Sequence, residues 1–156
     1  MQLTPSLLAK LADDFPALQF TEDVDFRWSD KDSTVYYDPH GDAALLLHEI
    51  AHAELKHVSY ERDITLLEME RDAWDHAIKH LFPRYGITPR EELVDEALDT
   101  YRDWLHARSM CPHCQSTGIQ TRVSSYKCLA CGTKWRVNEA RICALRRYVI
   151  QQKTPR

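Results

Sequence analysis

Two histidines and a glutamate in the stretch "LLLHEIAHAELKH", residues 45–57, form the pattern in this chain that is best suited to chemistry. On an α-helix, His48 and His52 are about 40° apart, so both imidazoles can reach one metal ion. Glu49 lies about 60° from His52 and can reach a water molecule beside that ion. The pattern therefore predicts a zinc site in which Glu49 is the general base for attack of water on a peptide carbonyl.

A third protein ligand is expected from the next predicted helix, which carries Glu68 and Glu70. These glutamates are about 200° apart on the helix, so only one of them can face the metal. Glu70 lies in the middle of an apolar stripe and Glu68 lies on the opposite, charged side; the stripe contains Leu66, Leu67, Ala73, Trp74, Ala77, Ile78 and Leu81. A buried carboxylate is costly unless a metal or a cation compensates it. We therefore predict that Glu70 is the third ligand, the alternative being a buried ion pair with an arginine or lysine.

His57 belongs to the same stretch but is not expected to bind the metal. If the helix continues through this residue, His57 lies about 140° from His52 and about 180° from His48. No glycine stands nearby to break the helix. We predict a surface histidine at the helix C-terminus, where the helix dipole favours its positive charge.

Four cysteines in the spacing C-x2-C-x13-C-x2-C predict a second metal site of a different kind. Cys111, Cys114, Cys128 and Cys131 can hold one tetrahedral zinc ion from two tight turns, as in a zinc ribbon. Four thiolates leave no open position for chemistry, so this zinc is predicted to be structural. A module of about 30 residues cannot build a sufficient core alone, and the metal would supply its folding energy.

The elements that must position these residues predict an α+β fold. A hairpin of two short strands is expected in "VDFRWSDKDSTVYYDP", residues 24–39, around the turn "SDKDS". Helices are predicted at about residues 4–14, 42–57, 60–82 and 88–107. The predicted architecture is a helix-rich, zincin-like core with a small antiparallel sheet, a zinc-ribbon hairpin and a C-terminal helix.

The distribution of charge predicts where the chain is divided. Residues 1–107 carry 10 Lys and Arg against 23 Asp and Glu, a net charge of −13. Residues 108–156 carry 10 against one, a net charge of +9. We therefore expect three parts: a metallopeptidase domain at 1–107, a four-cysteine ribbon at 108–138 and a cationic helix at 139–156.

The composition predicts a cytoplasmic protein without a membrane partner. Hydrophobic residues make up 44% of the chain and charged residues 28%, which suits a folded domain. No run approaches the roughly 18–20 apolar residues of a membrane span, and the N-terminus lacks the features of a signal peptide. In the cytoplasm, cysteines in C-x-x-C pairs are expected to bind metal rather than to form disulfides.

The motif "LLLHEIAH" followed by "EMERDAWDHAIKHLFP" resembles the ImmA/IrrE family of intracellular metallopeptidases over about residues 30–85. The resemblance implies zinc ligands at His48, His52 and Glu70 and a catalytic base at Glu49. It also implies a small sheet packed on helices, with "TVYYDP", residues 34–39, as an edge strand that holds an extended peptide. The chain departs from the family at two positions: Trp74 stands where the family usually has Asn or Asp, and His76 where it usually has Phe. In gluzincins generally, an Asp four residues after the ligand Glu orients a ligand histidine.

The cysteine module resembles the zinc ribbons of transcription factors and transposases. Its cations lie among aromatic residues, a combination that suits nucleic acid. The residues concerned are Arg122, Lys127, Lys134, Trp135 and Arg136. The alternatives are that the ribbon binds a protein or the acidic part of its own chain.

Two classes of function follow from these observations. The first is a zinc-dependent endopeptidase of narrow specificity, which uses the ribbon to recognise a regulatory or nucleic-acid-associated protein such as a transcriptional regulator. The second is an inactive protease-fold module that contacts DNA or protein through the ribbon. SprT-like DNA-associated proteases also join H-E-x-x-H to a ribbon, but this chain lacks their downstream histidine motif. The presence of Glu49 favours an enzyme, because a scaffold does not need that base.

Overall fold

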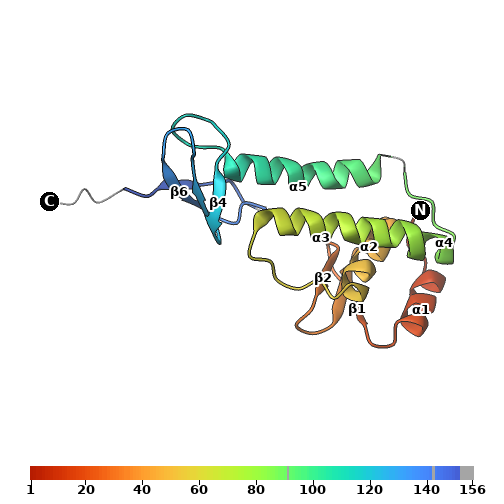
Figure 1. Ribbon diagram of the computed structural model, residues 1–156. Coiled ribbons are helices and arrows are strands. Elements are labelled where there is room, and N and C mark those ends of the chain that lie inside the picture. The colour runs from red at the N-terminus through yellow and green to blue at the C-terminus, as the bar shows by residue number, and fades with distance from the viewer. Residues whose placement is uncertain (91, 142, 152–156) are drawn as a thin grey trace. The chain divides into compact units, whose positions relative to one another are not determined.

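The computed structural model describes residues 1–90, 92–141 and 143–151, and the chain forms two compact units (Figure 1). The first unit comprises Met1–Ser59 and Met69–Val94, and the second comprises Tyr60–Glu68 and Asp95–Arg156. These units do not coincide with the predicted boundary after residue 107. The change in charge along the chain marks a change of surface composition, whereas the units are defined by packing.

The first unit begins with helix α1 (Pro5–Asp14) and a sheet of β1 (Gln19–Glu22), β2 (Arg27–Ser29) and β3 (Thr34–Tyr37). The Thr4 side chain caps α1 by accepting the Leu7 N–H, as a helix N-terminus requires. β2 and β3 form the predicted antiparallel hairpin, whereas β1 pairs with β3 in parallel.

The strand order is β1-β3-β2, so the expectation that "TVYYDP" forms an edge strand is wrong. β3 is the central strand because residues 19–22, which were not expected to form a strand, pair along its other side. An added peptide therefore finds no free backbone groups on β3. The edges of this sheet belong to β1 and β2.

Helix α2 (Ala43–Glu54) is buried on most of its surface, which explains its almost continuous apolar sequence. The Asp42 side chain caps it by accepting the Ala44 N–H. The core of this unit includes Leu11, Val35, Leu46, Leu47, Ile50 and Trp74. The two histidines of α2 are thereby held inside the unit rather than on its surface.

The predicted helix at 60–82 is α3 (Asp63–His76), followed by a π-helical segment η1 (Ala77–Leu81) and the short α4 (Phe82–Tyr85). A π-helical turn contains more residues than an α-helical turn, so it shifts the phase of every residue that follows. Ile78, which the projection placed on the apolar stripe, is 41% exposed, while Ala77 and Leu81 stay buried as the projection predicted.

Helix α5 (Leu93–Ser109) leads into a sheet that, within the described residues, has four strands: β4 (Ile119–Arg122), β5 (Ser125–Lys127), β6 (Lys134–Val137) and β7 (Arg147–Val149). All neighbours in this four-stranded sheet are antiparallel. The described helices include none that is long and apolar enough to cross a membrane.

The predicted C-terminal helix at 139–156 is wrong for the residues that the structure describes there, 139–141 and 143–151. These residues contain β7, whose Arg147, Tyr148 and Val149 pair with Val137, Arg136 and Trp135 of β6. The β-prone "RYVI" gains backbone hydrogen bonds from the edge of β6, which outweighs its moderate helix propensity. Residues 142 and 152–156 of the predicted helix lie outside the described residues.

A buried ion pair explains why residues 60–68 belong to the second unit. Asp63, at the start of α3, accepts from the Arg108 guanidinium at 2.5 Å and from the Tyr126 hydroxyl. Arg108 and Asp63 are both almost fully buried. The Trp135 indole N–H also donates to the Arg108 carbonyl at 3.1 Å. This network joins the first turn of α3, the end of α5 and the sheet.

Candidate metal sites

Three side chains of the first unit bring one potential ligand atom each to a common point. The Nε2 atom of His48 lies 3.1 Å from the Nε2 atom of His52 and 3.0 Å from Oε2 of Glu70. The Nε2 atom of His52 lies 3.4 Å from the same carboxylate oxygen. The two histidines come from successive turns of α2 and the glutamate comes from α3. These are the three residues that the sequence predicted as ligands.

The size of this triangle fits a zinc ion. Tetrahedral zinc binds nitrogen and oxygen at about 2.0–2.1 Å, which places the ligand atoms about 3.3–3.4 Å from one another. The observed separations of 3.0–3.4 Å are close to that value. Two imidazoles and one carboxylate are also a common protein ligand set of catalytic zinc, with the fourth position left open.

Glu70 is 6% exposed, whereas Glu68 is exposed, as the helical projection predicted. Burial by itself raises the pKa of the Glu70 carboxyl, because it disfavours the charged form. Hydrogen bonds from His48 and His52 outweigh this effect, and the net pKa of Glu70 is lowered. The carboxylate is therefore ionised at neutral pH, as a metal ligand must be.

Glu49 is in place next to the first histidine but is not one of the converging groups. It is half-buried on α2. Among the described residues, its carboxylate makes no hydrogen bond or ion pair that would occupy it. A carboxylate without such a partner is available to accept a proton, which is the role that the sequence predicted for it.

His57 is the main correction to the predicted site, because it contacts a ligand histidine. Its Nδ1 atom lies 2.8 Å from Nδ1 of His52, and its ring is half-buried. The projection assumed that the helix continues, but α2 ends at Glu54 and Lys56 adopts a left-handed conformation with φ of 55°. The chain turns back there without a glycine. The His57 N–H then donates to the His52 carbonyl at 3.0 Å.

Further contacts hold His57 in this position and make it neutral. The Trp28 indole N–H, on β2, donates to the His57 carbonyl at 3.0 Å. Burial lowers the pKa of His57, and the neighbouring His52 lowers it further. A neutral imidazole can accept a hydrogen bond at one nitrogen, so the two Nδ1 atoms can share one proton. The helical projection could not predict the half-buried position of His57, because it treated residues after Glu54 as part of the helix.

His48 is supported in a different way, by stacking on Trp74. The two ring centroids are 4.1 Å apart and the rings are tilted by 20°. The Nδ1 atom of His48 and the indole nitrogen of Trp74 are both buried without a hydrogen-bond partner among the described residues. Trp74 therefore contacts this histidine through the face of its ring and gives it no hydrogen bond.

The four cysteines of the second unit also converge. The Sγ atoms of Cys111 and Cys131 are 3.7 Å apart, and those of Cys114 and Cys128 are 3.5 Å apart. Zinc binds sulfur at about 2.3 Å, which places tetrahedral sulfur ligands about 3.8 Å from one another. All four ligand atoms lie within 4.8 Å of one another. The spacing is therefore compatible with one tetrahedral metal ion.

Two matching turns position these cysteines. In each turn, the residue after the second cysteine has a positive φ: 62° at Gln115 and 75° at Gly132. The N–H of that residue donates to the carbonyl of the first cysteine, at 3.0 Å in one turn and 3.1 Å in the other. Hydrogen bonds from Thr133 lower the pKa of the Cys131 thiol to about 5, which favours the metal-binding thiolate.

The predicted ligand-binding residues of the sheet fall on two different faces. The cations Arg122, Lys134 and Arg136 are exposed and Lys127 is half-buried. Trp135 is fully buried, and it packs with Tyr126, Cys111, Cys128 and Val137 in the core of this unit. Its inclusion among binding residues is wrong, because side chains alternate along a strand and Trp135 points opposite to its neighbours Lys134 and Arg136.

The seven predicted metal ligands thus form two separate groups, His48, His52 and Glu70 in one and four cysteines in the other. One contains a mixed nitrogen and oxygen set, and the other contains sulfur alone. Comparisons of the chain with protein-family models, with curated proteins and with solved structures found no match.

Proposed function

We propose that the protein is a zinc-dependent endopeptidase with a second, structural zinc ion in its four-cysteine cluster. The observation that carries this proposal is the convergence, within 3.0–3.4 Å, of two Nε2 atoms from the α2 motif that also contains Glu49 and one carboxylate oxygen of Glu70 on α3. A purely structural site has no use for an uncommitted carboxylate beside its ligands.

In this proposal each residue of the site has a distinct role. His48, His52 and Glu70 hold the zinc ion, which when bound polarises a carbonyl and makes water a better nucleophile at neutral pH. Glu49 accepts a proton from the water that attacks the peptide carbonyl. It then delivers that proton to the amine that leaves as the C–N bond breaks.

His57 and Trp74 act as positioning residues. If Nε2 of His52 faces the metal, its Nδ1 carries the ring proton and donates it to Nδ1 of His57. A neutral His57 is required for that bond, and the lowered pKa of His57 supports it. Trp74 restrains the ring plane of His48 by stacking.

The extended substrate is proposed to lie along the edge strand β2 rather than β3. β2 packs on α2, and its Trp28 side chain is bonded to the loop that carries His57. The outer edge of β2 has no strand partner among the described residues, so its backbone groups can pair with a peptide. Such pairing recognises the backbone of a peptide and discriminates weakly among its side chains. We therefore propose that the second unit recognises the target protein.

Glu49→Gln is the variant that tests the proposal. Elemental analysis should find about two zinc ions per chain in both proteins, because Glu49 is not a ligand. Proteins trapped on the Glu49→Gln variant should be cut by the intact protein but not by the variant. If neither the trapped proteins nor unstructured casein is cut, the enzymatic proposal fails.

The second candidate function is a protease-fold binding module without turnover. It is favoured by one observation: among the described residues, the buried Nδ1 atom of His48 lacks the hydrogen-bond partner that usually orients a ligand histidine. A ligand histidine without such a partner is a weaker metal ligand. Trapped proteins that bind equally to both forms and stay intact would establish this candidate.

A further inference from the structure

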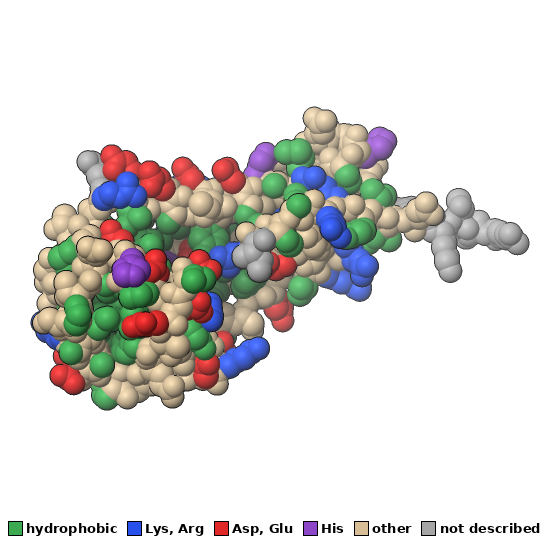
Figure 2. Space-filling model, turned by 180° about the vertical axis from the view of Figure 1, so that it is seen from behind, with side chains coloured by type: hydrophobic (Ala, Val, Ile, Leu, Met, Phe, Trp, Pro, Cys, Tyr) green, Lys and Arg blue, Asp and Glu red, His purple; other side chains and the backbone are tan. Residues whose placement is uncertain are grey.

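Four cations of the second unit gather on the solvent-facing side of the four-stranded sheet. Arg122, Lys127, Lys134 and Arg136 line one open groove of about 550 Å³, together with Thr121, Ser125 and Ile150. Figure 2 shows Lys and Arg side chains over this part of the chain. None of the four forms an ion pair with an acidic side chain of the described residues. We call these four residues the cationic face.

The strand register sets the cations close together. Lys127 of β5 stands directly opposite Lys134 of β6. In the neighbouring row, Ser125 of β5 lies between Arg122 of β4 and Arg136 of β6. Like charges in directly opposite positions destabilise a sheet. The fold therefore carries an uncompensated repulsion that a polyanionic ligand would relieve.

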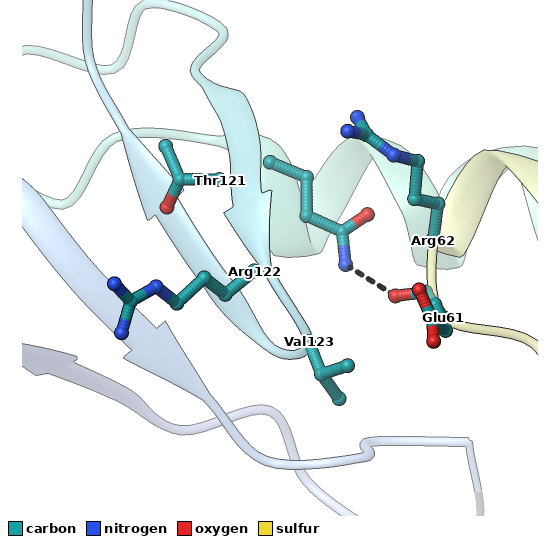
Figure 3. A pocket seen from close by; sticks show the side chains of 6 residues that line it. Glu61, Arg62, Thr121, Arg122 and Val123 are labelled. Carbon is teal, nitrogen blue, oxygen red and sulfur yellow. Dashed lines mark hydrogen bonds between the residues drawn. The ribbon is translucent and has the colours of Figure 1, made fainter.

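Glu61, which precedes α3, forms no ion pair with this face among the described residues. Figure 3 shows the adjacent pocket of about 300 Å³, which Arg122 also lines, together with Glu61, Arg62, Gln120, Thr121 and Val123. Gln120 donates to the Glu61 carbonyl at 3.3 Å, whereas the Arg122 guanidinium points away from Glu61 toward the neighbouring strands. Arg122 thus belongs to the cationic face and remains available to a ligand.

An exposed aromatic ring lies beside the cations. Tyr148 of β7 stands opposite Arg136 of β6 and is 51% exposed. Because partners in a register share a face, its ring lies on the same side of the sheet as the cationic face. Tyr148 was assigned to a helix by the sequence and was not recognised as a binding residue. A flat basic surface with an exposed ring is suited to bases that stack while their phosphates meet the cations.

We infer that the cationic face binds single-stranded nucleic acid, with Tyr148 as a stacking platform for one base. This goes beyond the proposed peptidase activity and does not depend on it. A duplex hides the faces of its bases, and an acidic peptide would gain charge contacts but no stacking. The exposed ring therefore favours a single strand over both.

The binding test uses a fluorescein-labelled oligothymidylate of about 15 nucleotides, within the site size of such surfaces, and fluorescence anisotropy with the full-length protein. The affinity should fall as the salt concentration rises. The double variant Lys127→Gln/Lys134→Gln should weaken binding by about 10-fold or more. It should also reduce the slope of log K against log salt by about 1.4, because two phosphate contacts are lost. Arg102→Gln is the control, because it removes one exposed cation that is paired with Asp99 on α5.

Tyr148 separates stacking from charge. Tyr148→Ala should weaken binding by about 5-fold or more and leave the salt slope unchanged. Tyr148→Phe, which keeps an aromatic ring, should bind with the affinity of the parent protein. Each variant should keep the zinc content and the circular dichroism spectrum of the parent, which shows that the sheet is folded. Glu49→Gln should bind the oligonucleotide with the same affinity as the parent protein. The binding test therefore gives the same answer whether or not the protein is a peptidase.

Three outcomes would overturn the inference. The first is the absence of binding even at about 50 mM salt, where electrostatic contacts are strong. The second is equal affinity for a duplex of the same length. The third is equal affinity for polyglutamate of matched charge, which would show that the cationic face binds any polyanion through charge alone.

Discussion

The two candidate metal sites differ in how the chain holds their ligands. His48, His52 and Glu70 are 5%, 7% and 6% exposed and lie on two helices that are packed into the core of the first unit. In the cysteine cluster two ligands are buried and two are exposed, and all four lie in or beside tight turns. We therefore expect the fold of the first unit to position its candidate site, and the second unit to need its metal in order to fold.

The difference has a chemical counterpart. Three protein ligands leave one position on a tetrahedral ion for water or substrate, and four thiolates leave none. The two units also differ in their cores: the first unit has a core of large apolar side chains, and we expect its stability to depend little on a metal ion. Loss of metal is therefore expected to affect the two units unequally, and the following predictions test that contrast.

The largest effect is expected for Cys128→Ser. Cys128 is fully buried in the small core of the second unit, and structural zinc in modules of this size contributes on the order of 10 kcal/mol to folding. We expect this variant to lose one zinc ion and the ordered sheet, with the first site still loaded, as measured by elemental analysis and NMR. Cys143→Ser, at an exposed cysteine outside the cluster, is the control. An ordered sheet in Cys128→Ser would refute the contrast.

A second prediction concerns Glu70→Gln. This change removes a charged ligand, and we expect zinc affinity at the first site to fall by about 10-fold or more, measured by competition with a chelator. Circular dichroism should stay close to that of the parent, because we expect the apolar core to hold the fold of this unit. Glu68→Gln, two residues earlier and exposed, is the matched control. Equal affinities in the two variants would remove Glu70 from the site.

A smaller loss is expected for His57→Ala. This variant removes the partner of the His52 Nδ1 atom, and such partners typically contribute about 10-fold to metal affinity. His57→Asn should recover part of the loss, because its amide oxygen can accept the same hydrogen bond. The exposed His80, changed to Ala, is the control. If His57→Ala and His80→Ala bind zinc alike, His57 has no positioning role.

The smallest effects are expected at the left-handed turns beside the two sites. Gln115→Gly and Lys56→Gly should each raise the free energy of unfolding by up to about 1 kcal/mol, because glycine adopts positive φ without steric cost. Gly132→Ala should have the opposite sign; its added methyl group would meet no atom within 4 Å, so only the backbone conformation is tested. Thermal unfolding of metal-loaded proteins measures all three. The same sign at Gln115 and Gly132 would contradict this account.

The residues that converge at both candidate sites could be predicted from the sequence because each was recognised from local spacing. His48 and His52 lie one turn apart on a helix, and the pairs of cysteines fit tight turns wherever they occur. Glu70 required one further step, the projection of α3, and that step worked because the segment before η1 is a regular α-helix. In each case the signal comes from local geometry: the period of an α-helix for the histidines and Glu70, and the tight turn for each pair of cysteines.

The remaining features were decided by contacts between distant parts of the chain. His57 meets His52 because Lys56 reverses the chain and Trp28 of β2 holds the loop that follows. β3 is a central strand because β1 pairs with it, and "RYV" is a strand because the edge of β6 is available. Local propensity cannot predict such pairings, since their free energy comes from hydrogen bonds and burial that exist only after the chain has folded.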